Sequence, residues 1–200
     1  MNAALRLPQQ PLLGPDFEFR SWSSEDIPSL VKAWRDPEMH RWMPEEEEPF
    51  DDRRARDFVA GASAHLAEGT MLAMAISDRS TNEAAGSITY NVWTAHHWNI
   101  GYWISKAHRG RGLATRAVIA ATRWAFEERP ELSRISLYTQ PGNVASQRVA
   151  ERAGFQREGT LRKWANVRGS ALDWVMFSLL REEVPSSGGD LPADLKPSGR

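Results

Sequence analysis

Hydrophobic positions change their spacing several times along the chain, and each change predicts a new element. Phe17 and Phe19 alternate with polar residues up to Trp22, as in a half-buried strand. Apolar residues then recur every three to four positions in two runs, which predict one helix ahead of Pro37 and another from about Asp51. The first run is Ile27, Leu30, Val31 and Trp34, and the second is Ala55, Phe58, Val59, Ala62 and Leu66. Residues 42–49, between the helices, are expected to form a loop.

Three strand-like runs follow at 71–77, 86–93 and 98–105, and the polar turns between them predict antiparallel neighbours. Helical spacing returns from Leu113 and ends at Pro130, after which residues 134–139 again resemble a strand. A strand, a long helix and a second strand in this order predict a right-handed crossover and a parallel pair.

A short helix is expected at 143–152, ending at Gly154 in the left-handed conformation, and a hairpin of strands 156–164 and 172–180 closes the chain. The order β-α-α-β-β-β-α-β-α-β-β predicts an α+β fold, a mixed and mostly antiparallel sheet of about seven strands with about four helices. One domain should span 16–184. Residues 1–15 are expected to form a flexible N-terminal tail and residues 185–200 a disordered C-terminal tail, because both lack apolar periodicity and contain several prolines.

The composition of the chain excludes several kinds of site and argues against several classes of partner. The 200 residues carry 25 Lys and Arg against 26 Asp and Glu, so no basic excess favours binding to nucleic acid or to an anionic membrane. The absence of Cys excludes disulfides, thiolate metal sites and a cysteine nucleophile, and favours a reducing compartment. The longest apolar run is too short to span a bilayer, so we expect a cytoplasmic protein, with no metal ion predicted. Nine Trp are many for this length.

The clearest chemical signal is a basic, glycine-containing loop between the strand at 98–105 and the helix that begins near Leu113. The first amides of a helix lack an acceptor within it, so they attract anions, and Gly110 and Gly112 let the backbone approach a phosphate. Nearby cations are Lys106, Arg109, Arg111 and Arg116. The pattern predicts a pyrophosphate cradle, and a flexible basic turn is the alternative. Thr115 stands where a dinucleotide fingerprint needs its third glycine.

Two motifs in this part of the chain resemble one family. Arg109-x-x-Gly112-x-Ala114, after the strand sequence 100–104 (Ile-Gly-Tyr-Trp-Ile), resembles the acyl-coenzyme A (CoA) motif of the GNAT acyltransferase superfamily. A second segment, Asn-Val-Ala-Ser at 143–146 followed by Arg-Ala-Gly-Phe at 152–155 and Glu-Gly at 158–159, resembles the RimJ/RimL branch of ribosomal-protein N-acetyltransferases. Together the motifs cover about residues 98–160.

The resemblance implies a GNAT-type fold in which the strand 98–105 splays from the strand 134–139, and an acyl-CoA lies in the gap. The amide of Ile104, or of a neighbour, would then polarise the thioester carbonyl. Asn143 would hold the pantetheine arm, and Ser146 would protonate the departing thiolate. Without the motif, Ser146 is an ordinary serine in the first turn of a helix. The implied cofactor-binding residues are Ile104, Arg109, Gly110, Arg111, Gly112, Leu113, Ala114, Thr115 and Asn143.

The identity of the general base is left open. The relatives carry a carboxylate a little beyond the Glu-Gly step, whereas residues 163–167 of this chain, around Ala165, contain none. Direct transfer needs a neutral amine, so a base or a water chain is expected. Candidates are His96, His97, Asp173 and the acidic residues 45–48. Each candidate also has a purely structural interpretation. The histidines would be solvated loop residues, Asp173 would pair with an arginine, and residues 45–48 would form a solvated acidic loop. Four Trp residues are candidates either for walls of the acceptor cleft or for core packing: Trp42, Trp93, Trp98 and Trp164.

The sequence thus predicts an N-acyltransferase that moves an acyl group, in first place acetyl, from acetyl-CoA or another acyl-CoA to a primary amine. Three acceptors fit: a protein N-terminus, an aminoglycoside-like molecule and a polyamine-like molecule. One alternative is a succinyl-CoA donor, for which the basic residues Arg162, Lys163 and Arg168 would matter, and another is a non-catalytic CoA-binding module. Neither a nucleic acid nor a membrane is an expected partner. A homodimer through an edge at 172–180 is a further hypothesis.

Overall fold

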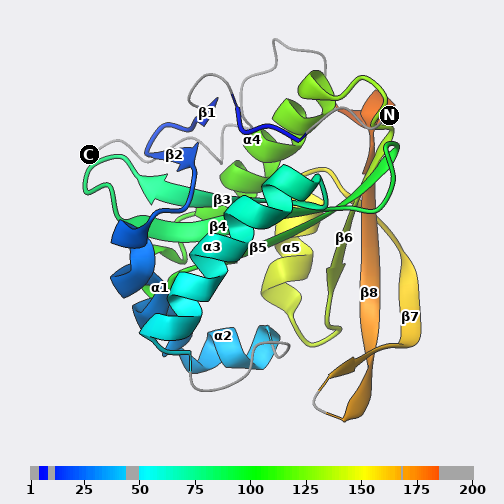
Figure 1. Ribbon diagram of the computed structural model, residues 1–200. Coiled ribbons are helices and arrows are strands. Elements are labelled where there is room, and N and C mark those ends of the chain that lie inside the picture. Colours follow the sequence, from blue (N-terminus) through cyan, green and yellow to red (C-terminus); the bar gives the residue numbers. More distant parts are fainter. Residues whose placement is uncertain (1–4, 9–11, 44–49, 168, 185–200) are drawn as a thin grey trace.

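The computed structural model describes residues 5–8, 12–43, 50–167 and 169–184 (Figure 1). Within these ranges, eight strands form one sheet in the order β1-β2-β3-β4-β5-β6-β8-β7. The strands are β1 Leu12–Leu13, β2 Phe17–Arg20, β3 Met71–Asp78, β4 Ala84–Val92, β5 His97–Ile104, β6 Arg134–Thr139, β7 Gln156–Val167 and β8 Ser170–Leu180. The α-helices are α1 Ile27–Trp34, α2 Pro37–Trp42, α3 Asp52–Glu68, α4 Leu113–Glu128 and α5 Val144–Arg152, and short 3-10 helices are η1 Ser24–Asp26, η2 Lys106–His108 and η3 Arg181–Glu183. The predicted mixed, mostly antiparallel α+β architecture is confirmed, with one more strand and one more helix in the described ranges than expected.

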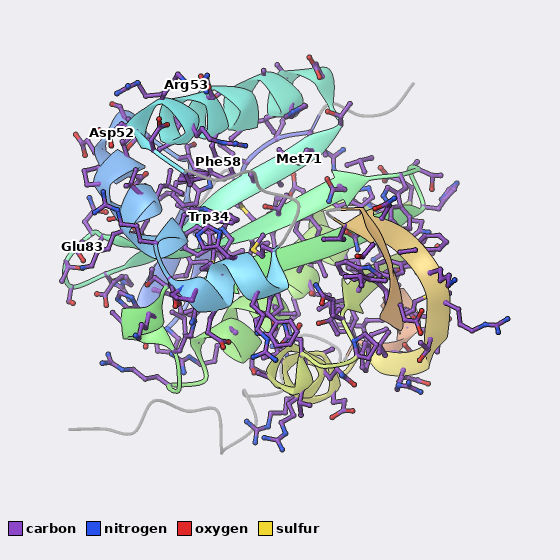
Figure 2. The ribbon with its side chains drawn as sticks, turned by 90° about the horizontal axis from the view of Figure 1, so that it is seen from below. Trp34, Asp52, Arg53, Phe58, Met71 and Glu83 are labelled. Atoms are coloured by element: carbon purple, nitrogen blue, oxygen red, sulfur yellow. The ribbon has the colours of Figure 1, made fainter. Side chains whose placement is uncertain are left out.

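Helices cover both faces of the sheet and create two apolar layers. Strand β3 serves both: Leu72, Met74 and Ile76 pack in one layer with α4, and Ala73 and Ala75 pack in the other with α1 and α3. Figure 2 shows Trp34 of α1 and Phe58 of α3 in the second layer, beside Met71. Because both faces of β3 are buried, its sequence is a continuous apolar run instead of an alternating one.

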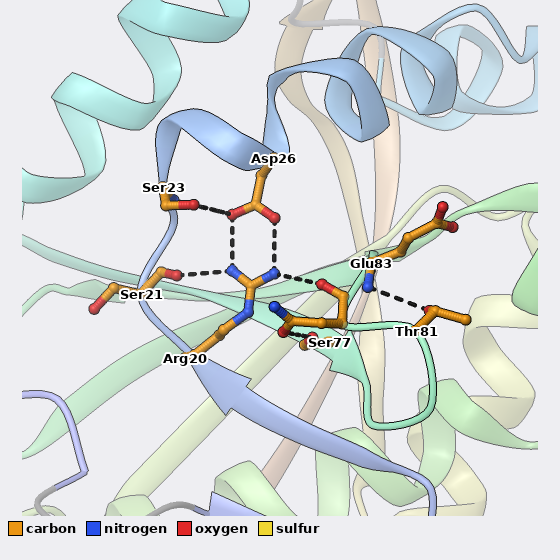
Figure 3. Close-up of polar contacts among 8 residues, drawn as sticks. Arg20, Ser21, Ser23, Asp26, Ser77, Thr81 and Glu83 are labelled. Carbon is orange, nitrogen blue, oxygen red and sulfur yellow. Dashed lines mark hydrogen bonds and ion pairs between the residues drawn. The ribbon is translucent and has the colours of Figure 1, made fainter.

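The junction between β2 and α1 is fixed by a buried ion pair. Arg20 donates two hydrogen bonds of 2.8 Å to the two carboxylate oxygens of Asp26, whose side chain is 3% exposed (Figure 3). The backbone N–H and the hydroxyl of Ser23 also donate to this carboxylate. Burial alone would raise the pKa of Asp26, but the hydrogen bonds from Arg20 and Ser23 outweigh it and hold the pKa below its usual value.

Helix α2 differs from the prediction, in which Pro37 only ends the preceding helix. Pro37 is instead the first residue of a new helix, a position at which the missing N–H of proline costs nothing. Asp36 is its N-cap and accepts a hydrogen bond from the amide of Glu38. Trp42 therefore closes a helix and does not open a loop. The other residues of the expected loop, 44–49, lie outside the described residues.

Strands β5 and β6 form the expected parallel pair, joined by the crossover helix α4. Apolar residues of α4 pack on the sheet in one continuous layer, and the buried ones include Leu113, Ala117, Val118, Ala121, Trp124 and Ala125. The other described strand pairs are antiparallel. The neighbouring α5 packs on the same face through Ala150. This arrangement places the ends of β5 and β6, with the helices that follow them, side by side.

The closing hairpin differs from the prediction in its position within the sheet. Strand β8 lies between β6 and β7 and pairs with both. The prediction that residues 172–180 form an exposed, dimerising edge is therefore wrong: both backbone edges of that strand are already paired, and β7 is the outer strand.

The N-terminal segment is in part packed on the domain. Strand β1 pairs with β2, and Leu5 belongs to the main apolar layer with 8% of its surface exposed. The expectation of a flexible tail therefore fails for these described residues, because leucine side chains at positions 5 and 12 find apolar partners in the tertiary structure. Residues 185–200, expected to form the other tail, lie outside the described part. No helix in the described part is both long and apolar enough to cross a membrane.

Candidate active site

The parallel strands β5 and β6 separate soon after they meet. Their paired residues are 97–99 and 134–136, although β5 continues to Ile104 and β6 to Thr139. On the other side, β5 is paired with β4 from Trp98 to Ile104. The amide of Ser105 donates to Ala85 of β4, and amides alternate in direction along a strand, so those of Tyr102 and Ile104 face the opening. The predicted splay is thus present, with backbone donors directed into it.

The glycine loop ends at the first turn of α4. Gly110 and Gly112 have positive φ angles of 78° and 70°, which a residue with a side chain adopts only under strain. Gly112 is the N-cap of α4, so the amides of Leu113, Ala114 and Thr115 have no acceptor within the helix. Such a turn, with no Cβ at Gly112, leaves room for an anion, and the pyrophosphate cradle stays a prediction.

Two of the four cations predicted beside this loop make ion pairs within the protein. Arg109 makes an ion pair of 2.6 Å with Asp36 and donates from Nε to the carbonyl oxygen of Ile104 at 2.8 Å. Arg116, which is 4% exposed, makes an ion pair of 2.7 Å with Asp16 and donates to the carbonyl oxygen of Arg111. The side chains of Lys106 and Arg111 are exposed. The contacts of Arg109 and Arg116 therefore fix the loop to the rest of the domain.

Ser146 lies in the first turn of α5, where Asn143 is the N-cap and accepts a hydrogen bond from the Ser146 amide at 3.1 Å. The Ser146 hydroxyl accepts a hydrogen bond of 3.1 Å from the hydroxyl of Tyr102 on β5. Burial is the main cause that raises the pKa of Tyr102 to about 12, so this phenol is protonated at neutral pH. Tyr102 was not among the predicted site residues. The sequence signal for it was its position between Ile100 and Ile104, which places its side chain on the face of β5 that α4 and α5 cover.

Helix α2 connects the ends of the two separating strands. At its start, the N-cap Asp36 pairs with Arg109, which follows β5. At its end, the ring of Trp42 lies 3.4 Å from the position of a Cβ at Gly142, in the turn between β6 and α5. The helix therefore crosses from one side of the opening to the other. Trp42, a predicted wall residue, is placed at the site's margin.

The predicted histidines differ in their surroundings. His97 lies where β5 meets β6, and its Nε2 is 2.7 Å from the hydroxyl of the buried Ser136. Burial, and then the charge of Arg134, lower the pKa of His97, so the ring favours its neutral form. The Nδ1 of His96 is 2.8 Å from the carbonyl oxygen of Glu131, away from this pair. Of the two, only His97 lies in the polar cluster at the strand junction.

Other candidate bases and cations are less well placed. Asp173 is exposed and accepts a hydrogen bond of 2.8 Å from the backbone amide of Lys163, instead of pairing with an arginine or facing the opening. Arg162 and Lys163 are exposed on the outer strand β7. The acidic residues 45–48 and Arg168 lie outside the described residues.

Of the four tryptophans predicted either to line the cleft or to pack in the core, one is a core residue and two others are exposed. Trp98 is 3% exposed and belongs to the apolar layer under α4. Trp93 and Trp164 are 48% and 56% exposed. Both contact the ring of Tyr138 on β6. The exposed pair therefore lies on either side of a residue in the separated part of that strand.

One family and two relatives that match this chain are named as acetyltransferases. A family profile described as an acetyltransferase (GNAT) domain matches residues 16–156. The uncharacterized N-acetyltransferase p20 of Bacillus licheniformis is 31% identical over 167 residues, which are 82% of this chain and 92% of that protein. The putative ribosomal N-acetyltransferase YdaF of Bacillus subtilis is 43% identical over 84 residues, which are 42% of this chain and 45% of the relative.

Solved structures share the architecture. Mycobacterium smegmatis RimJ in complex with CoA-disulfide has a TM-score of 0.75 with this structure at 24% identity, over 84% of each chain. At this identity the likeness concerns the fold. The family match at 16–156 includes the separated strands, the glycine loop and the first turn of α5, but not the candidate residues on β7 and β8.

Proposed function

This chain belongs to the GNAT acetyltransferase family and is an acyl-CoA-dependent N-acyltransferase, and we propose that it transfers acetyl from acetyl-CoA to the α-amine of a protein N-terminus. Two observations support this choice of substrates. One relative is named a putative ribosomal N-acetyltransferase, and one solved neighbour is named a ribosomal L7/L12 alpha-N-protein acetyltransferase. The described residues that would favour a longer, acidic acyl group, Arg162 and Lys163, are exposed on the outer strand.

One feature carries the assignment of the reaction site: the opening between β5 and β6 has backbone donors on one side and the Ser146 hydroxyl on the other. The amides of Tyr102 and Ile104 face into it, and Ser146 is tied to Tyr102 by a hydrogen bond of 3.1 Å. A thioester lying there has its carbonyl oxygen within range of fixed donors, which stabilise the negative charge that develops during attack.

The chemical step follows from these positions. The neutral amine nitrogen attacks the thioester carbon and forms the C–N bond, and the negative charge moves to the carbonyl oxygen. The C–S bond then breaks as the carbonyl re-forms, and the thiolate takes the proton of the Ser146 hydroxyl. Ser146 regains a proton from Tyr102, which in turn recovers one from water. The amine gives its surplus proton to water at the open face, so the step balances as thioester plus amine to amide plus thiol.

The nearest alternative is a CoA-binding module without catalysis. The Tyr102–Ser146 pair argues against it, because a hydroxyl backed by a second donor serves no evident purpose in binding alone. The two functions separate in one experiment. The purified chain is titrated with acetyl-CoA, succinyl-CoA, CoA and ATP by calorimetry, and then incubated with acetyl-CoA and N-terminal peptides under mass spectrometry.

Binding of acetyl-CoA together with a mass gain of one acetyl on the peptide α-amine supports the proposal. A preference for succinyl-CoA identifies a different donor, and binding without transfer to any amine supports the module. No binding of any thioester contradicts the proposed site.

A further inference from the structure

Three aromatic rings from distant parts of the chain form a continuous row on the sheet. Trp93 follows β4, Tyr138 belongs to β6 and Trp164 belongs to β7. The ring centroids of Trp93 and Tyr138 are 5.6 Å apart, and those of Tyr138 and Trp164 are 6.2 Å apart with planes only 6° from parallel. Roughly half of each indole remains exposed, at 48% and 56%. We call these three residues the aromatic row.

The aromatic row lies on the face of the sheet that α4 and α5 leave free. Ile135 and Leu137 of β6 pack in the layer under α4. Side chains alternate along a strand, so Tyr138 points to the opposite face, and the two tryptophans that contact it lie there as well. The glycine loop, Ser146 and its partner Tyr102 belong to the other side. An amine that attacks the thioester therefore has the face of the aromatic row as its approach.

Tyr138 also places the row at the opening itself. The last paired residue of β6 is Ser136, so Tyr138 belongs to the part that has already separated from β5. The other two rings extend from this point in both directions, Trp93 towards the strand junction and Trp164 towards the tip of the hairpin. A group bound on the row therefore lies beside the opening between β5 and β6.

The outer end of the row depends on an irregular strand. The pairing of β7 with β8 shifts between Leu161 and Ala165, and Lys163 in this bulge has a positive φ of 50°. The carboxylate of Asp173 accepts a hydrogen bond from the Lys163 amide at 2.8 Å and so holds the bulge. A bulge redirects the side chains next to it, and here the next residue is Trp164. Asp173 is thus a positioning residue for the row.

At the strand-junction end of the row, the charges are already compensated. Arg134 makes a double hydrogen bond with Glu158, whose carboxylate also accepts from Ser178. His97, packed against Trp93 at 4.8 Å between ring centroids, favours its neutral form because burial lowers its pKa. Ring faces are thus the main binding surface offered here, and flat or bulky apolar groups match them better than polycations do.

We infer that the aromatic row binds an aromatic or large aliphatic side chain at the first or second position of the acceptor's N-terminus, and so selects the substrate. The inference rests on the proposed function, because the acceptor enters through that face only if the site transfers acetyl to an amine. Its occupant is one side chain of a protein N-terminus, held on Tyr138 and flanked by the two indoles.

The test uses peptides that share the first residue and differ at the second, with Phe, Trp or Leu compared with Gly, Asp or Lys, and a second set varied at the first residue. At saturating acetyl-CoA, we expect kcat/KM to be at least tenfold higher for the aromatic and aliphatic members of one set. Trp164→Ala, Trp93→Ala and Asp173→Ala should reduce this preference to below threefold through KM, without change in the Kd of acetyl-CoA. Leu13→Ala removes an equally exposed apolar side chain from the far edge of the sheet and should leave the preference intact.

Direct binding keeps the two proposals separable. Calorimetric titration of the preferred peptide into CoA-loaded protein should give a Kd that weakens at least fivefold in Trp164→Ala, even if transfer itself fails. Equal kcat/KM across both peptide sets, or equal peptide binding by the variants, overturns the inference and leaves N-acetyl transfer standing. Faster acetylation of spermidine or of tryptamine than of every peptide also overturns it, since the acceptor is then not a protein N-terminus.

Discussion

The Tyr102 hydroxyl donates a hydrogen bond of 3.1 Å to the Ser146 hydroxyl, and this contact joins β5 to the first turn of α5. Each residue is positioned independently. Tyr102 extends from a strand that is paired with β4, and Ser146 follows the Asn143 N-cap of its helix. The pair therefore has little freedom to move, and it lies beside the opening in which the proposed thioester reacts.

Replacing Ser146 by Ala should reduce kcat about 100-fold, the usual contribution of a general acid, with little change in the KM of acetyl-CoA. Tyr102→Phe, which removes only the donor behind the serine, should reduce kcat about three- to tenfold. Steady-state kinetics at saturating acetyl-CoA measures both. Ser80→Ala, in the exposed turn between β3 and β4, is the matched control and should behave as the unmodified protein. An unchanged kcat in Ser146→Ala would show that the thiolate obtains its proton elsewhere.

Gly112→Glu should abolish the binding of acetyl-CoA, because it adds a side chain and a negative charge where the pyrophosphate is proposed to lie. Gly112→Ala should weaken it less, by strain at φ 70° and by a Cβ placed 3.4 Å from Arg116. Calorimetry measures the affinity. Gly61→Ala in α3 meets nothing within 4 Å, so it should keep the affinity and stabilise the fold by about 0.5–1 kcal/mol. Wild-type affinity in Gly112→Glu would place the phosphates elsewhere.

Asp36→Asn should raise the KM of the amine acceptor about fivefold, while the Kd of acetyl-CoA changes less. Asparagine still caps α2 but loses the charge that pairs with Arg109, so the helix that crosses the opening is held less firmly. Bisubstrate kinetics measures both constants. Asp57→Asn, in an exposed pair with Arg53, removes an equal charge and should change neither. If both variants give the same acceptor KM, α2 does not depend on this ion pair.

Asp26→Asn should destabilise the protein by about 3 kcal/mol at pH 7, because it breaks a buried ion pair and leaves Arg20 without its partner. The folded pKa of Asp26 is below its usual value, so its contribution is fully present above the unfolded carboxyl pKa of about 3.9. That contribution is lost as the pH falls through the lower folded pKa. Urea denaturation at several pH values should show the variant's deficit narrowing in that acid range. A deficit independent of pH would mean that packing, not charge, is responsible.

His97→Gln should make stability less sensitive to mild acid. The folded pKa of His97 is lowered by burial and by Arg134, so below about pH 6.5 the unfolded chain takes up a proton before the folded protein does. The unmodified protein therefore loses stability from about pH 6.5 down to the folded pKa, and the variant lacks this loss. Comparing urea midpoints between pH 8 and pH 5 tests the difference. Parallel curves for the two proteins would indicate an ordinary histidine.

The elements that carry the cofactor loop could be predicted because their signals are local. Glycines at positions 110 and 112 set the backbone of a few successive residues, and helical spacing from Leu113 fixes where α4 begins. The same holds for Asn143 and Ser146, which interact within one turn. Where a local signal was ambiguous the prediction failed: Pro37 suits both the end of one helix and the start of the next.

The fold class, the family motifs and the order of the elements could be predicted from local patterns, because hydrophobic spacing, caps and turns act over a few residues. Three relationships became visible only in the folded chain: β8 inserts between β6 and β7, Tyr102 contacts Ser146, and Trp93, Tyr138 and Trp164 form one row. These relationships join residues tens of positions apart. They depend on which strands pair and in which register, and neither composition nor periodicity encodes that choice.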